Sequence, residues 1–163
     1  MMQFRKWIKR GRLALAAVFF TLAGSGVALS SDTMLPDDPD ELVETIRLAI
    51  EQSDYQKLEK LVFWKDAGKI KKRIVRFQLN RNLGRPIKSI AFEDFPVGGL
   101  DAIEAAGNLE ANMEITNRVR VIFDEEPIND QGKLPTTVFV VGKRQGVYRV
   151  ALVVRKGMDD DGD

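Results

Sequence analysis

The sequence predicts an α+β domain in which three N-terminal helices pack on a curved antiparallel sheet of about four strands. Apolar residues recur at helical spacing as far as residue 83. After Pro86 the spacing changes to the alternation of strands, and strand-like segments then follow one another. With 44% hydrophobic and 30% charged residues, the 163-residue chain has the composition of an ordinary globular protein.

The beginning of the chain has the order of regions typical of a cleavable export signal over residues 1–30. Residues 1–12 are basic and contain no acidic side chain, and residues 13–23 carry no charge. Ala28 and Ser30 are small residues two positions apart, so we expect cleavage after Ser30, with Ala28 as the alternative. The signal predicts an exported protein of the bacterial periplasm or the extracellular space. A retained membrane anchor is the other interpretation.

Composition limits what the rest of the chain can do. We expect a flexible lead-in over residues 31–37, a single domain over 38–157 and a disordered acidic tail over 158–163. Five of the 25 Lys and Arg residues precede residue 13, whereas all 24 Asp and Glu residues follow it. The remainder of the chain is therefore net acidic, which argues against nucleic-acid binding. The chain has no cysteine and no histidine, which excludes thiolate and histidine chemistry. We expect no metal and no cofactor.

Capping residues mark the first two helices. Asp38 and Pro39 suit the N-cap and the first helical position, and apolar residues from Leu42 to Ile50 follow at helical spacing. The Ser53-Asp54 pair interrupts this helix, and Ser53 with Gln56 caps a short second one. The two together form a broken opening helix.

The third predicted helix spans residues 67–83. Asp66 is its predicted cap, and Gly84 followed by Pro86 ends it. Its apolar stripe, which should face the core, consists of Ile70, Ile74, Val75 and Phe77.

Strands are predicted from Ile87 onward. Ile87–Phe95 forms the first, and residues 109–123 show the clearest alternation, as one strand or two collinear strands. Asn117 is the one polar residue on the apolar face of that segment. It predicts either a polar contact within a pocket or a bulge at Thr116-Asn117. Residues Glu110, Asn112 and Glu114 lie on the opposite face, which we expect to be solvated.

A hairpin closes the domain. Thr136–Gly142 and Val147–Arg155 are its strands, and Lys143–Gly146 is its turn. Both strands are apolar on both faces, so we expect them to be central or covered.

These elements resemble the NTF2-like superfamily of cone-shaped α+β domains. The resemblance is carried by the opening helix from Leu42 to Val62 with its Ser53-Asp54 break, by the helix ending at Leu83-Gly84, and by the closing hairpin from Val140 to Val150. It covers most of the chain beyond the signal, and it implies a bent sheet that wraps the helices into a cone. Members of the superfamily include isomerases, dehydratases, dimerisation modules and exported domains.

The leading functional hypothesis is an exported, non-catalytic domain that binds a small apolar ligand or a protein partner through its cone or sheet surface. The large number of apolar residues, together with the lack of evident catalytic residues, motivates this hypothesis. Ordinary core packing is the other interpretation of the aromatic residues. The residues expected to contact a ligand are Trp64, Phe77, Met113, Asn117 and Tyr148.

The third helix also carries a basic patch. Lys69, Lys72, Arg73 and Arg76 could bind an anionic partner or make weak contact with a membrane surface, although such a run is more often a solvated helix face.

Two further hypotheses stay open. One is a small lyase or isomerase that uses Asp and Tyr chemistry inside the cone, which would require Asp94, Glu93 or Tyr148 at the floor of an apolar pocket. The other is a membrane-tethered interaction protein, if the signal is retained. Each of these hypotheses is compatible with a homodimer.

Overall fold

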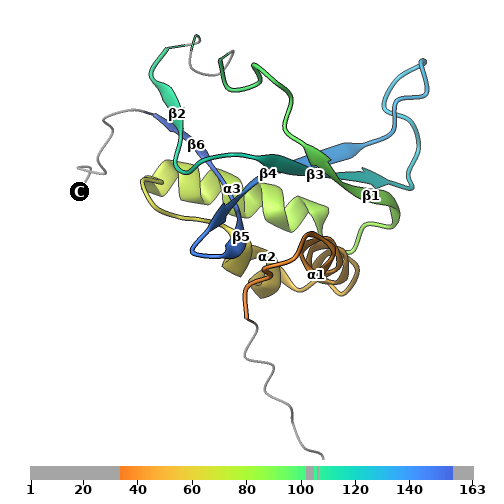
Figure 1. Ribbon diagram of the computed structural model, residues 1–163. Coiled ribbons are helices and arrows are strands. Elements are labelled where there is room, and N and C mark those ends of the chain that lie inside the picture. Colours follow the sequence, from red (N-terminus) through yellow and green to blue (C-terminus); the bar gives the residue numbers. More distant parts are fainter. Residues whose placement is uncertain (1–33, 102–104, 106, 156–163) are drawn as a thin grey trace, which may run out of the picture. The chain divides into compact units, whose positions relative to one another are not determined.

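The computed structural model describes residues 34–101, 105 and 107–155 (Figure 1). The export signal, the start of the lead-in and the acidic tail lie outside these residues. The described chain is α+β, as the sequence predicts. Its elements are α1 Pro39–Glu51, α2 Tyr55–Leu61, α3 Lys69–Asn82, β1 Ile87–Asp94, β2 Leu109–Ala111, β3 Asn117–Phe123, β4 Thr136–Arg144, β5 Val147–Val150 and β6 Val153–Arg155.

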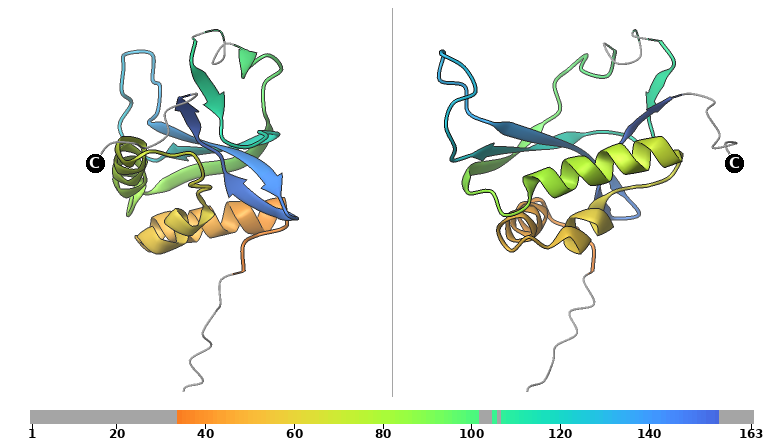
Figure 2. Two further views of the ribbon diagram at one scale, coloured as in Figure 1. Left: turned by 90° about the vertical axis from the view of Figure 1, so that its left-hand side faces the viewer. Right: turned by 180° about the vertical axis from the view of Figure 1, so that it is seen from behind.

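The main sheet is antiparallel, with the strand order β1-β3-β4-β5, and β2 pairs with β6 in a separate two-stranded sheet. The sheet bends strongly enough for Phe92 of β1 and Tyr148 of β5 to meet edge to face, with 5.5 Å between ring centroids. The helices cover one face of this sheet (Figures 1 and 2). The core lies between them, where Leu42, Ile46 and Phe123 are fully buried.

The beginning of α1 confirms the predicted cap. A carboxylate oxygen of Asp38 accepts hydrogen bonds from the backbone N–H groups of Asp40 and Glu41, at 2.8 and 3.3 Å. These bonds satisfy donors that no helical carbonyl can reach. For α2 the predicted cap is wrong by one residue. Ser53 has a positive φ of 57°, and Asp54 caps the helix by accepting from Lys57 N at 3.0 Å.

The predicted start of α3 is also wrong. Asp66 has a φ of 59° within the turn that precedes the helix, and Gly68 is the N-cap, without a side-chain hydrogen bond. The end was predicted correctly, since Gly84 has a φ of 70° and its N–H donates to Ile50 O of α1 at 2.7 Å.

The core-facing stripe predicted for α3 is mostly wrong. Val75 is buried as expected, but Ile70, Ile74 and Phe77 are 68%, 47% and 62% exposed. The helix has two apolar ridges on different sides, and it turns Val75 and Leu79 toward the sheet. Periodicity shows that a helix has ridges but not which ridge meets the core.

The alternating segment 109–123 forms two strands that are not collinear. β2 pairs with β6, and β3 lies between β1 and β4 in the main sheet. The chain turns sharply between them, so that β2 points away from the plane of β3 (Figure 2). The turn spans residues 112–116 and is fixed by the side chain of Asn112, which is half-buried instead of solvated.

The closing hairpin has its turn at Gln145 and Gly146, where φ is 52° and 85°, as a two-residue hairpin turn needs. Its second strand is shorter than predicted. β5 ends at Val150, and the chain bends at Ala151-Leu152 to join the second sheet as β6. β5 is therefore the last strand of the main sheet, but its outer edge is covered, since Tyr148 N donates to Pro36 O at 2.7 Å and Phe63 N donates to Val150 O at 2.9 Å.

Candidate functional site

Because the chain bends away from β4 after β5, a cleft opens between α3 and β4. The cavity has a volume of about 550 Å³, within the range of sites that bind small molecules or peptide segments. Residues of the helix, of β4 and of the β5–β6 bend line it. They include Val75, Leu79, Val138, Phe139, Leu152 and Val153.

One wall of the cleft is an open strand edge. β4 pairs with β3 over Thr136–Val141 but with β5 only over Val141–Arg144. On the β5 side the carbonyl of Val140 accepts from Ala151 N at 2.9 Å. Backbone groups alternate in direction along a strand, so the N–H and C=O groups of Val138 and Thr136 point to this same side. No strand of the described residues pairs with them there.

A buried polar pair fixes the helix to the strand beside this edge. Asn82, 4% exposed in the last turn of α3, accepts a hydrogen bond at its Oδ1 from Thr137 Oγ1 of β4 at 2.9 Å. Asparagine is disfavoured in helix interiors, and this bond provides a reason for its position. The helix therefore stays in place beside the strand without filling the space between them.

Cations line the same cleft. Lys71 is half-buried, burial lowers the pKa of its ammonium group, and it forms no ion pair within the described part of the chain. Arg85 differs, because it makes two hydrogen bonds of 2.7 Å to the Glu125 carboxylate and lies 3.6 Å above the Phe123 ring. Lys71 is thus a half-buried charge to which a ligand carboxylate could bind.

The structure does not bring the five predicted ligand-contacting residues together. Trp64 lines a second, shallower hollow of about 470 Å³ and donates from Nε1 to Glu59 O at 3.3 Å. Phe77 lies on the exposed side of α3, with Arg81 at 6.0 Å from its ring. Neither residue lines the α3–β4 cleft.

The other three lie along the strands. Asn117 begins β3 and donates to the Asp94 carboxylate at 3.2 Å. Tyr148 packs on Phe92, and its ring lies 5.0 Å from the Lys143 ammonium. Met113 is half-buried in the turn before β3, and none of the three lines the cleft.

The basic patch divides into paired and unpaired cations. Arg76 binds the Glu59 carboxylate at 2.9 Å and lies 5.6 Å above the Trp64 ring. Lys72 and Arg73 form no ion pair with any residue that the structure describes. Lys69, the fourth member, is the first residue of α3.

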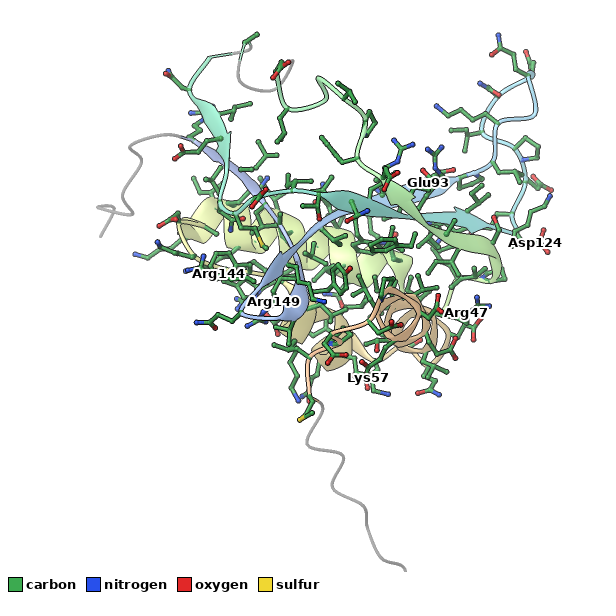
Figure 3. All side chains as sticks on the ribbon, viewed as in Figure 1. Arg47, Lys57, Glu93, Asp124, Arg144 and Arg149 are labelled. Atoms are coloured by element: carbon green, nitrogen blue, oxygen red, sulfur yellow. The ribbon has the colours of Figure 1, made fainter. Side chains whose placement is uncertain are left out.

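The acidic residues named for a catalytic role lie elsewhere. Glu93 lies on the outer face of the sheet, away from α1 (Figure 3), where Arg118 and Arg120 bind its carboxylate at 2.7 and 2.9 Å. Asp94 is exposed at the end of β1. Neither residue, nor Tyr148, lines the α3–β4 cleft.

The Glu93 cluster predicts a dependence of stability on acid. Hydrogen bonds from Arg120 and then Arg118 lower the pKa of Glu93 below its ordinary value of 4.5. Since its pKa is lower in the folded than in the unfolded state, the stabilisation is complete above about pH 4.5 and is lost as the pH falls through the lowered value. Urea unfolding of Glu93→Gln should therefore show a smaller loss of stability between pH 7 and pH 3 than the parent. Glu126→Gln, at an exposed site, should keep the parent's loss, and equal losses in both variants would refute the role of the cluster.

No protein-family model, curated protein or solved structure matches the chain. None of the described helices is long and apolar enough to cross a bilayer. Fold and cleft alone thus define the class: an α+β domain with a groove between a helix and an open strand edge.

The cleft residues carry little signal in the sequence. Leu79 and Val75 belong to a helical ridge that looks like core, and Val138 and Val140 belong to a continuous apolar run. Only Asn82, a buried polar residue late in a helix, departs from local preference. The open edge itself depends on where β5 bends, which no residue type specifies.

Proposed function

We propose that the protein is an exported, non-catalytic domain that binds an extended segment of a protein partner in the α3–β4 cleft. The observation that carries this proposal is the open edge at Thr136 and Val138, which lies beside an apolar cleft of about 550 Å³. Export itself stays a prediction from the sequence, since residues 1–33 lie outside the described part.

An extended peptide suits this cleft better than an alkyl chain. The free N–H and C=O groups of β4 need hydrogen-bond partners, and a peptide strand supplies both kinds, whereas a hydrocarbon supplies none. Alternate side chains of an added strand would face α3, where Val75 and Leu79 form an apolar wall. A carboxylate on the peptide would pair with Lys71.

The proposal is tested with peptides selected from a random decapeptide display library on the immobilised full chain. The best peptide is then synthesised and titrated by calorimetry. Val138→Pro removes the outward N–H without touching the bonds to β3, because that N–H points to the open side. Losing this one hydrogen bond should weaken binding by up to about tenfold.

The matched control places proline on the other edge of the sheet. Phe95 N donates to Thr116 O on the β3 side, so the N–H of Asp94 points outward from β1. Asp94→Pro should therefore leave peptide affinity unchanged. Equal losses in both variants, the absence of any selected peptide, or tight binding of decanoate with no peptide competition would each contradict a peptide site.

A further inference from the structure

Helix α3 presents its second apolar ridge to solvent. Ile70, Ile74 and Phe77, 68%, 47% and 62% exposed, lie within an arc of about 60° at the 100° per residue of an α-helix. From behind, α3 is the front element, and no other helix or strand stands between it and the viewer (Figure 2, right). These three large apolar side chains on one exposed helix face lie outside the core cluster and mark an interaction surface.

The same helix is strongly cationic. Its 14 residues contain no acidic side chain. Arg73 and Arg76 lie on one flank of the ridge, and Arg81 lies along it at 6.0 Å from the Phe77 ring. Arg76 is bound to Glu59, whereas Lys72 and Arg73 have no acidic partner within the described residues. The basic residues of α3 are Lys69, Lys71, Lys72, Arg73, Arg76 and Arg81.

We propose that this face of α3 docks on a bilayer that contains anionic phospholipid. Apolar side chains on a helix face flanked by Lys and Arg are the pattern of helices that lie in the membrane interface, with the side chains entering the headgroup region. A diffuse anionic surface attracts all cations of the helix at once, whatever their spacing. The apolar ridge is separate from the peptide cleft, which Val75 and Leu79 line on another side of α3, although Arg81 borders both.

A bilayer also fits the shape of the ridge better than an acidic protein does. Neither of the two hollows described above is lined by Ile70, Ile74 or Phe77. Side chains that project from an exposed helix form a convex ridge, and a protein partner would need a groove shaped to these three side chains. Lipid headgroups rearrange around any convex ridge.

The absence of cysteine allows a site-resolved test on the full chain. Ile74→Cys is labelled with the environment-sensitive dye NBD and mixed with vesicles of phosphatidylcholine containing roughly 30 mol% phosphatidylglycerol. The emission should shift to the blue and increase several-fold, because the dye enters an apolar layer. Val97→Cys, at a fully exposed position between β1 and β2, is the matched control and should not respond.

Charge reversal supplies the second test. Arg73→Glu with Arg81→Glu, two cations on the flank of the ridge and along it, introduced into the labelled chain, should weaken vesicle affinity by about tenfold or more, at about fivefold per lost cation. Lys88→Glu with Lys133→Glu makes the same change of net charge at exposed sites outside α3 and should have a much smaller effect. Raising the salt concentration to about 0.5 M should weaken binding of the parent.

Four results would overturn the proposal. They are no response of the dye at position 74, an equal response to pure phosphatidylcholine, and an equal response at position 97, which would indicate adsorption through another part of the chain. The fourth is a response to poly-glutamate without a response to vesicles, which would point to an acidic polypeptide instead.

Discussion

Replacing Gly142 by alanine is expected to destabilise the domain by about 3 kcal/mol. Gly142 is buried in β4, and an added Cβ would overlap the carbonyl oxygen of Glu114 and lie 3.1 Å from Met113 Cε. Since the clashing atom is a backbone carbonyl oxygen, it cannot rotate away as a side chain could. The same segment is held on β4 by Thr116 N, which donates to Val141 O at 3.1 Å. Thermal unfolding should show a midpoint lower by about 10 °C.

Gly132→Ala is the control for this substitution. Gly132 has a positive φ of 74° and no neighbouring atom within 4 Å of an added Cβ, so alanine there meets only the backbone penalty of about 1 kcal/mol. The difference between the variants measures the collision at Glu114. Similar losses would mean that the 112–116 turn moves freely off β4, against the close packing described above.

The features that the sequence predicted correctly depend on neighbours in the chain. The Asp38 cap, the break at Ser53-Asp54 and the end of α3 at Gly84 are each decided within a few residues, where side-chain hydrogen bonds and allowed φ values act directly. The β1 strand and the hairpin turn at Gln145-Gly146 are equally local. Such local features can be predicted without knowing which elements pack together in the fold.

The features that were missed depend on distant partners. Which ridge of α3 is buried is decided by the sheet that it meets, so Ile70 and Phe77 could not be told from Val75 by periodicity. The break between β2 and β3 lies inside an unbroken alternation, because each strand has its own partner, β6 or β4. The candidate cleft results from the bend after Val150, and its edge became visible only with the strand pairing.

Asn112 shows how one such distant contact is made. Its Nδ2 donates to Phe63 O and Lys65 O, at 2.6 and 2.9 Å, in the connection between α2 and α3. Its Oδ1 accepts from Leu152 N at 2.8 Å, at the bend between β5 and β6. One side chain thus ties three connections together, and among them is the bend that opens the candidate cleft.

Asn112→Ala should therefore lower the free energy of unfolding by about 3 kcal/mol, since three hydrogen bonds of about 1 kcal/mol each are lost. Asn80→Ala removes an exposed asparagine whose Nδ2 bonds only to Arg76 O within α3, and it should change stability by less than about 0.5 kcal/mol. Urea unfolding measures both. Equal stabilities of the two variants would mean that water replaces the three bonds of Asn112 without loss. The bend after Val150 would then be held by strand pairing alone, and the geometry of the cleft would not depend on this side chain.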